Sequence, residues 1–181
     1  MPQSTMPLLI GTLMPDFSVW DVMLERWVSS SVFDGQPVVI AFMCNHCPYV
    51  QRILRPWIDM VKLYQKKNIG FLMVSSNDIA RYPQDSPDNM VALVKEKDIT
   101  CSYCYDENQL MAKAFQAKCT PEFFVYDEQK SLVYHGCFDR SANGETPNGE
   151  ELSKALDALL MGGEPIKKQY PSLGCSIKWI E

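Results

Sequence analysis

The sequence predicts an α/β protein, and three features of its 181 residues indicate that class. A continuous apolar run, 38–43, is typical of a strand that is buried on both faces. From Cys47 onward the apolar residues take the spacing of an amphipathic helix, and a second apolar run follows at 71–74. Two strands joined by a helix form a βαβ crossover, in which the strands lie parallel.

Periodicity and turn residues predict the other elements in order. A hairpin of two short strands precedes the first apolar run, and Asp34–Gly35 is the turn that leads into it. Ser86 suits the N-cap of a helix because a proline and an acid follow it. The further expected elements are strands at 17–22, 26–32, 122–126 and 131–134 and helices at 47–67, 87–97, 110–116 and 149–161.

Composition and charge indicate a globular protein of one domain, 1–181, with a C-terminal tail at 164–181. The chain is 46% hydrophobic and 22% charged, which suits a soluble fold. Its net charge of −5 and the lack of a basic block argue against nucleic acid or an anionic membrane as partner. The N-terminus has no basic segment of a signal peptide, and the longest apolar run is too short to span a membrane. We therefore expect a cytoplasmic protein, in which most of the seven cysteines stay reduced.

The pair Cys44-Asn45-His46-Cys47 lies where the first predicted strand turns into the long helix. Such a pair can bind a metal, form a structural disulfide or act as a redox couple. A zinc ribbon needs two such pairs, and a second one exists at Cys101 and Cys104. That second pair lies in an extended segment, where alternation points its two cysteines to opposite faces. The position therefore favours redox chemistry and leaves metal binding as an alternative.

A helix start activates a thiol because its backbone N–H groups are unpaired and carry partial positive charge. A thiolate there is stabilised, so its pKa falls and it becomes nucleophilic near neutral pH. We expect Cys44 to be this thiolate and the more exposed cysteine, and Cys47 to resolve the mixed disulfide. His46 could add positive charge near the sulfur. Stabilisation of the thiolate by His46 predicts a reduction potential more oxidising than about −270 mV.

Thr120–Pro121 opens the predicted strand at 122–126. A proline at the start of a buried strand is tolerated where no ladder hydrogen bond is needed, and this position suits a cis peptide bond.

With these motifs in this order, the chain resembles the thioredoxin fold, and within it the redoxin branch of AhpC/TSA-like, peroxiredoxin-like proteins. The resemblance begins near Pro15 and extends to the C-terminus, and its landmarks are 42–50, 75–78, 119–124 and 174–179. It implies a central mixed β-sheet flanked by helices, an N-terminal β extension and a C-terminal tail. It also implies a thiol–disulfide oxidoreductase that needs no cofactor, acts on a disulfide substrate and takes electrons from a dithiol donor.

Residue roles carry over from this resemblance. Cys44 would be the attacking cysteine, Cys47 the resolving cysteine, and Pro121 a cis-proline beside them. Thr120, with Asn45 and Pro48 of the cysteine motif, would position the substrate.

Val38 stands where many thioredoxins have a buried acid that accepts the proton of the resolving cysteine. Glu122 is our candidate replacement for that acid, and a solvated residue at the strand edge is the alternative interpretation of Glu122.

A thiol peroxidase is the first rival function. Aligned with peroxiredoxins, Cys47 would be the peroxidatic cysteine, but Cys44 replaces a Thr or Ser and Pro121 replaces an arginine. Efficient peroxide reduction is therefore disfavoured. The second rival is a metal-binding, copper-chaperone-like module that uses the same two cysteines.

Four further cysteines are most simply small buried hydrophobic residues, namely Cys101, Cys104, Cys119 and Cys137. Cys119 should lie near the site because it precedes Pro121 by two residues. Cys175 could act as a third redox cysteine, or protect the disulfide, if the tail folds back over Pro121.

Overall fold

The computed structural model describes residues 2–141 and 144–181 and contains a seven-stranded mixed sheet. Its strands are β2 (Ser18–Asp21), β3 (Arg26–Ser29), β4 (Val38–Phe42), β5 (Gly70–Ser75), β6 (Ser102–Tyr105), β8 (Glu122–Tyr126) and β9 (Leu132–Gly136). Their order across the sheet is β3-β2-β6-β5-β4-β8-β9. β4 is parallel to β5 and antiparallel to β8, so the predicted βαβ crossover and the terminal hairpin share one sheet.

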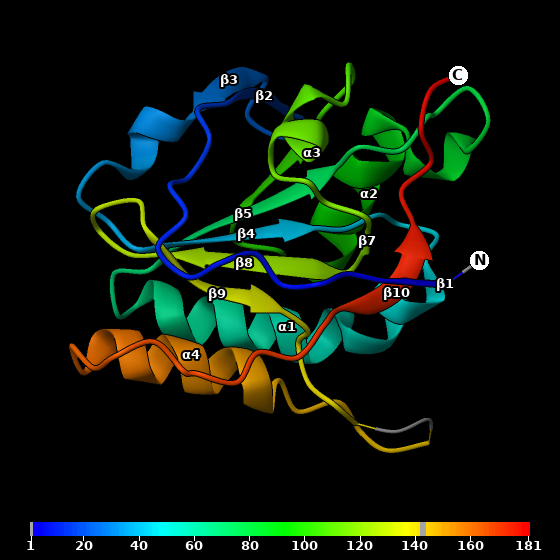
Figure 1. Ribbon diagram of the computed structural model, residues 1–181. Coiled ribbons are helices and arrows are strands. Elements are labelled where there is room, and N and C mark those ends of the chain that lie inside the picture. The colour runs from blue at the N-terminus through cyan, green and yellow to red at the C-terminus, as the bar shows by residue number, and fades with distance from the viewer. Residues whose placement is uncertain (1, 142–143) are drawn as a thin grey trace.

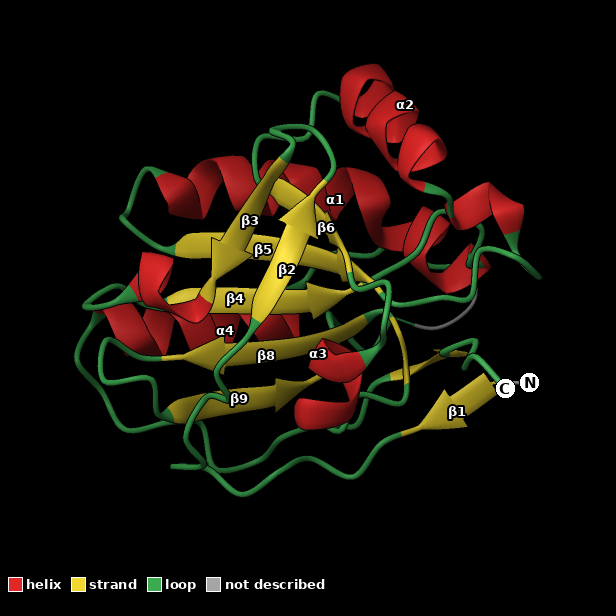
Figure 2. Cartoon of the chain, turned by 90° about the horizontal axis from the view of Figure 1, so that it is seen from above, coloured by secondary structure: helices red, strands yellow, loops and turns green. Residues whose placement is uncertain are grey.

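Helices cover both faces of this sheet, as Figure 2 shows from above. They are α1 (Pro48–Gln65), α2 (Pro87–Lys97), α3 (Leu110–Ala114) and α4 (Glu150–Leu160), with short 3-10 turns η1 (Ser30–Phe33) and η2 (Pro83–Asp85). α1 and α4 lie together along one face of the sheet (Figure 1). Buried residues of α1, α2 and α4 share one core cluster, and those of α3 belong to the cluster on the other face. Among the described helices, none has the length and apolar character needed to cross a bilayer.

Alternate residues of β4 face the two clusters, as period-two geometry requires. Val39 and Ala41 belong to the cluster beneath α1, whereas Val38 and Ile40 belong to the opposite one. The strand is buried throughout, which agrees with its continuous apolar sequence.

A second, three-stranded sheet forms at one end of the molecule. It consists of β1 (Pro2–Ser4), β10 (Leu173–Ser176) and β7 (Cys119–Thr120), in the order β1-β10-β7. The tail thus folds back beside the Thr120–Pro121 segment, as Figure 1 shows in red. Gly174 permits this approach, since a Cβ atom there would lie 2.0 Å from the carbonyl oxygen of Thr120.

Two sequence predictions of element ends were wrong. The expected strand 26–32 stops at Ser29, because the chain turns into η1, where Phe33 is buried in the core. The expected helix 110–116 stops at Ala114, and Gln116 adopts a positive φ of 56°, which ends helical geometry. Ser86 caps α2 as predicted, and its hydroxyl accepts a hydrogen bond from the N–H of Asn89.

Candidate active site

The two cysteines of the motif meet at the junction between β4 and α1. β4 ends at Phe42, and Cys47 is the N-cap of α1 with Pro48 in the first helical turn. The Thr120–Pro121 peptide bond is cis. Both cysteines contact Thr120, since the Cys44 Sγ lies 3.4 Å from its Oγ1 and the Cys47 Sγ lies 3.2 Å from its carbonyl oxygen. The fold therefore brings Cys44, Cys47, Thr120 and Pro121 together, although they come from distant parts of the chain.

The expected difference in exposure between the cysteines was wrong. Cys44 is 1% exposed and Cys47 is 0% exposed, so both sulfurs lie inside the core cluster beneath α1. A substrate can reach either sulfur only when the covering segments move.

The directions of the two pKa shifts favour a thiolate on Cys47, whereas the sequence predicted it on Cys44. The hydrogen bond from Cys44 lowers the pKa of Cys47 to about 4 against the effect of burial, with help from Cys175, Thr120 and the backbone N–H of Val50. The pKa of Cys44 is raised by the same hydrogen bond, by burial and by Asp85. Cys47 is also the N-cap of α1, where the partial positive charge of the helix start favours a thiolate. Together these directions favour a reduced pair that shares one proton, with the negative charge toward Cys47.

Titration of the reduced protein tests this assignment. A thiolate with a lowered pKa is present above that pKa, so its absorbance near 240 nm is expected at pH 7. The absorbance should disappear as pH falls through about 4. Cys47→Ser should remove this signal, and Cys44→Ala should move it to higher pH because the hydrogen bond is lost. Cys44→Ser is the matched control, since its hydroxyl can still donate; a signal that survived in Cys47→Ser would place the thiolate elsewhere.

A buried carboxylate that sequence reasoning missed holds the cysteine motif in place. The side chain of Asp85 is 0% exposed, and its Oδ1 accepts hydrogen bonds from the backbone N–H groups of Asn45 and His46 at 2.8 and 3.1 Å. Its Oδ2 bonds to the His46 Nδ1 at 2.6 Å and accepts from the Asn77 side-chain amide at 2.8 Å. The only indication of this carboxylate's surroundings in the sequence was that Asn77 lies in the polar segment after the second buried strand. The contact between Asp85 and the motif spans 40 residues and follows no local spacing.

His46 is paired with Asp85, and no hydrogen bond joins its ring to either cysteine among the described contacts. The ring is 20% exposed and stacks on Tyr82, with a centroid distance of 5.4 Å. Any positive charge on His46 is offset by the Asp85 carboxylate. The electrostatic effect on the cysteine thiols that we expected from His46 alone is therefore the joint effect of His46 and Asp85.

Asn45 and Pro48, both expected to position substrate, differ in what they can do. The Asn45 side chain accepts a hydrogen bond from the Tyr103 hydroxyl at 3.0 Å and donates one to the carbonyl oxygen of Gln84 at 3.2 Å. Both of its polar atoms are therefore used in hydrogen bonds within the protein. Pro48 is exposed at the start of α1 and remains available to a substrate.

Both interpretations of Glu122 were wrong. Glu122 is fully buried, and alternation along β8 directs it to the sheet face opposite Cys44 and Cys47, since Phe123 belongs to their cluster. Its Oε1 bonds to the His135 Nε2 at 2.7 Å, and its Oε2 accepts from the N–H groups of Lys118 and Cys119. The Nδ1 of His135 accepts from a backbone N–H, so the ring proton lies on Nε2 and points at Glu122. Glu122 is thus a structural carboxylate and no proton acceptor for Cys47.

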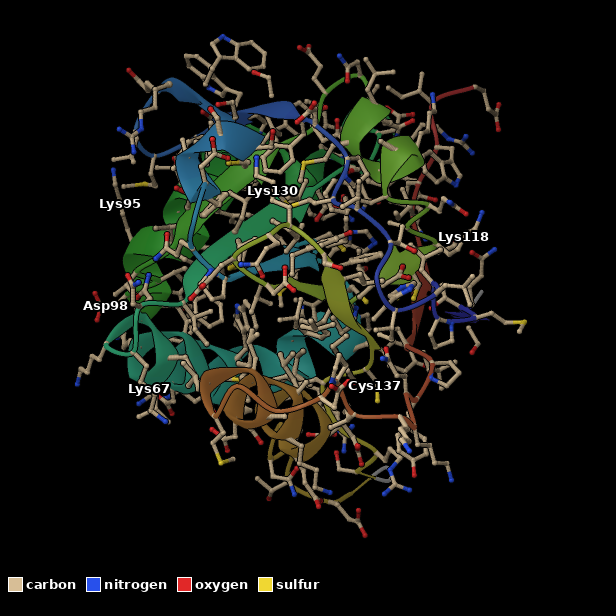
Figure 3. The ribbon with its side chains drawn as sticks, turned by 60° about the vertical axis from the view of Figure 1, so that its left-hand side comes forward. Lys67, Lys95, Asp98, Lys118, Lys130 and Cys137 are labelled. Atoms are coloured by element: carbon tan, nitrogen blue, oxygen red, sulfur yellow. The ribbon has the colours of Figure 1, made fainter. Side chains whose placement is uncertain are left out.

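The remaining cysteines differ in their position relative to the site. Cys101 and Cys104 are buried in core clusters on opposite faces of the sheet, so they cannot complete a zinc ribbon with the motif. Cys137, labelled in Figure 3, is half-buried just after β9. Cys175 is different, because its strand lies beside Thr120 and its side chain packs against the core cluster that contains Cys44 and Cys47.

One group of described residues offers ligands of the kind that metals use. Atoms of Cys44, His46 and Asp85 lie within 4.8 Å of one another. Both Asp85 oxygens already accept hydrogen bonds, including two from backbone N–H groups of the motif. An ion would have to replace those bonds, and the donor set therefore fits a hydrogen-bonded scaffold better than a metal centre.

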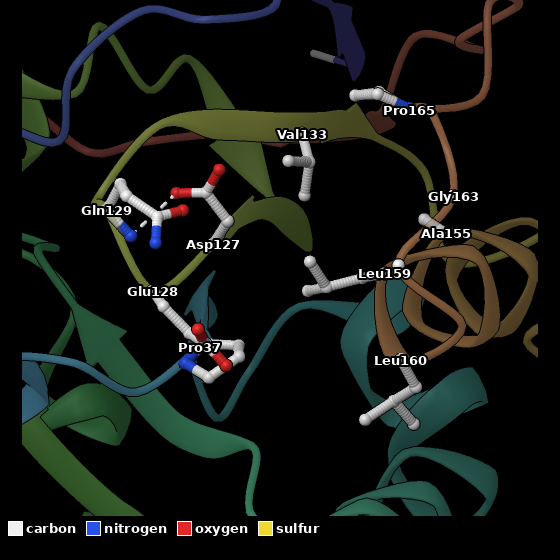
Figure 4. Close-up of a pocket in the computed structure, with 11 residues that line it drawn as sticks. Pro37, Asp127, Glu128, Gln129, Val133, Ala155, Leu159, Leu160, Gly163 and Pro165 are labelled. Carbon is white, nitrogen blue, oxygen red and sulfur yellow. Dashed lines mark hydrogen bonds between the residues drawn. The ribbon is translucent and has the colours of Figure 1, made fainter.

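Two pockets differ in their relation to the cysteines. One of about 430 Å³ lies between Pro37, the turn at Asp127 and the end of α4 (Figure 4). Because Pro37 precedes β4 and Cys44 follows it, this pocket is at the far end of the strand from the site. A pocket of about 280 Å³ adjoins the site, since Tyr49, Arg52 and Pro121 line it.

Comparison with known proteins assigns the family. The AhpC/TSA family model matches residues 10–135. The chain belongs to the AhpC/TSA family. Its strand–CxxC–helix unit and mixed sheet are the thioredoxin-like fold of that family, as the sequence predicted.

Several solved structures are similar to this AhpC/TSA protein. An uncharacterized conserved protein from Geobacillus kaustophilus is 37% identical, with a TM-score of 0.96 over 99% of this chain and 97% of that one. A hypothetical protein from Sinorhizobium meliloti 1021 is 34% identical, with a TM-score of 0.94 over 99% of both chains. The thioredoxin domain of a thiol-disulfide oxidoreductase from Bacteroides vulgatus shares the fold at 14% identity, with a TM-score of 0.62 over 82% of this chain and 98% of that one. The search of curated proteins gave no match.

Proposed function

We propose that this protein is a thiol–disulfide oxidoreductase that uses Cys44 and Cys47 as a reversible dithiol–disulfide couple. The observation that carries the proposal is the contact of both thiols with Thr120 beside a cis-proline, with the Cys47 sulfur at the N-cap of α1. The family and the oxidoreductase named among the structural neighbours support it.

The lowered pKa of Cys47 suggests an order of steps that differs from the order expected from sequence. The Cys47 thiolate attacks one sulfur of the substrate disulfide, forms a mixed disulfide and releases the other sulfur as a thiolate. The Cys44 sulfur then attacks the Cys47 sulfur and breaks the mixed disulfide, and its proton passes to a departing substrate thiolate. Two electrons move from the protein to the substrate, and a dithiol donor later reduces the Cys44–Cys47 bond.

The pocket beside Pro121 is the place we propose for the substrate chain. Tyr49 and Arg52 of α1 line it together with Arg140. The Tyr49 ring would suit a peptide segment that carries an apolar or aromatic residue near its disulfide.

The first experiment is the redox equilibrium of the pair in glutathione buffers, read by thiol labelling and mass spectrometry. We expect one two-electron transition that both Cys44→Ser and Cys47→Ser remove. Its midpoint should be more oxidising than the value of about −270 mV for thioredoxin, because the low pKa of Cys47 stabilises the reduced form. If no disulfide joins these cysteines at any potential, the proposal is wrong. Metal stoichiometry of the reduced protein would then test the metal-binding alternative.

A thiol-dependent peroxidase is a second candidate, because the lowered pKa of Cys47 favours a thiolate on the residue directly before Pro48. Two positions still argue against it, since Cys44 and Pro121 stand where peroxiredoxins have a hydroxyl residue and an arginine. Hydrogen peroxide consumption with an added dithiol separates the two functions. Fast consumption that depends on Cys47 but not on Cys44 would favour the peroxidase.

A further inference from the structure

The C-terminal strand brings a third sulfur to the cysteine pair. In the antiparallel pairing of β10 with β7, Cys175 lies opposite Thr120, the residue that contacts both site thiols. The Cys175 side chain packs against the core cluster that contains Cys44 and Cys47, and the Cys47 sulfur is close enough to influence its charge. Cys175 is therefore a third sulfur beside the cysteine pair, on the side of Cys47.

Cys175 is held in this place from several sides. Gly174 lets the strand lie against Thr120, and the N–H of Ile177 donates to the carbonyl oxygen of Lys118 at 3.1 Å. The N–H of Lys178 donates to the Asn77 side chain at 2.8 Å, and Asn77 in turn donates to Asp85. The tail is thus tied to the same carboxylate that holds the cysteine motif, which fixes Cys175 relative to Cys47.

The difference in exposure between Cys175 and the cysteine pair suggests a role for Cys175. Cys44 and Cys47 are buried, whereas Cys175 is only half-buried. A dithiol donor in solution can reach Cys175 more readily than either sulfur of the buried pair, and access limits the rate of thiol–disulfide exchange.

We propose that Cys175 is a relay cysteine, which exchanges the Cys44–Cys47 disulfide for a Cys47–Cys175 disulfide that an external dithiol can reach. The proposal rests on the proposed oxidoreductase function and adds a second disulfide to its cycle.

The exchange is an isomerisation without net oxidation. The Cys175 thiolate attacks the Cys47 sulfur, a Cys47–Cys175 bond forms, the Cys44–Cys47 bond breaks, and Cys44 leaves as a thiolate that takes up the proton lost by Cys175. In the reduced protein, burial and the neighbouring Cys47 raise the pKa of Cys175 to about 11, and Lys178 opposes this rise. Once Cys47 is in a disulfide, its negative charge is absent, so Cys175 ionises more easily at the moment when attack is required.

The test uses the Cys44→Ser variant of the full chain, treated with oxidised glutathione. The Cys47 thiolate should take one glutathione, and Cys175 should then displace it, which leaves an intramolecular Cys47–Cys175 disulfide that peptide mass mapping identifies. In Cys44→Ser/Cys175→Ser the glutathione should remain on Cys47. Cys44→Ser/Cys119→Ser is the matched control, because Cys119 is also close to these sulfurs but buried, and it should still form the Cys47–Cys175 bond.

A persistent glutathione adduct in Cys44→Ser, or a disulfide of Cys47 to Cys119, would overturn the relay. A second measurement separates this failure from failure of the proposed function. Cys175→Ser should keep the two-electron Cys44–Cys47 transition, because the serine hydroxyl can replace the thiol beside Cys47, but should be reduced more slowly by a protein dithiol than the wild type. An equal rate would also overturn the relay, whereas loss of the Cys44–Cys47 transition in the wild type would refute the oxidoreductase itself.

Discussion

Cys47→Ser is expected to abolish disulfide reduction, with a loss of roughly 10³-fold or more, because it removes the thiolate nucleophile itself. We expect Cys47 to be the nucleophile because its pKa is lowered, chiefly by Cys44, and because it is the N-cap of α1. The measurement is the rate of reduction of a disulfide substrate with a dithiol donor in excess. Cys101→Ser is the matched control, since Cys101 is a buried cysteine of the same core cluster and should retain activity.

A trapping experiment identifies the attacking sulfur independently of the rate. Cys44→Ser/Cys175→Ser lacks both neighbours that could resolve a mixed disulfide, so it should accumulate substrate bound to Cys47. Cys47→Ser should accumulate none. Substrate bound to Cys44 in the Cys47→Ser variant would restore the order of attack that the sequence suggested.

Asp85→Ala is expected to give the largest loss of stability among substitutions near the site, about 3 kcal/mol in the free energy of unfolding of the reduced protein. Without the carboxylate, the N–H groups of Asn45 and His46 and the Asn77 amide lose their common acceptor. Buried donors without a partner cost the full desolvation penalty, and the cysteine motif loses its anchor. Urea denaturation of the reduced protein measures the effect.

Two variants show whether the carboxylate itself is responsible. Asp85→Asn keeps the size and one acceptor oxygen, so it should lose less stability than Asp85→Ala. Like Asp85→Ala, it should make the Cys44–Cys47 midpoint more oxidising, because the negative charge that raises the pKa of Cys44 is gone. Asp59→Ala removes a solvent-exposed acid paired with Arg55 and should cost no more than about 0.5 kcal/mol. Equal losses in Asp85→Ala and Asp59→Ala would contradict the anchoring role.

The parts of the site that follow from local sequence were predictable. Cys44 and Cys47 are recognisable because the change from a buried strand to an amphipathic helix marks the place where a thiol is activated. Pro121 is recognisable because it opens an apolar strand. Which of the two sulfurs has the lower pKa could not be predicted from the sequence. It depends partly on which residue is the N-cap, and helix boundaries shift by a residue or two with tertiary context.

The long-range partners of the site could not be read from the sequence. Nothing in the spacing of residues shows that Asp85 accepts hydrogen bonds from the cysteine motif, or that Glu122 turns away from it toward His135. The sequence predicted a role for Cys175 only on the condition that the tail folds back over Pro121. A tail without hydrophobic periodicity does not indicate where it folds.

The sequence by itself therefore determined the α/β class, the cysteine couple and the proline beside it, since each rests on hydrophobic periodicity or on residue chemistry within a few positions. Only the tertiary structure decided which sulfur carries the charge, which carboxylate holds the motif and where Cys175 lies. Those properties depend on burial and on hydrogen bonds between segments 40 to more than 100 residues apart, such as the bond from Lys178 to Asn77. Such contacts arise only when the sheet closes and the tail pairs with the strand that leads into Pro121.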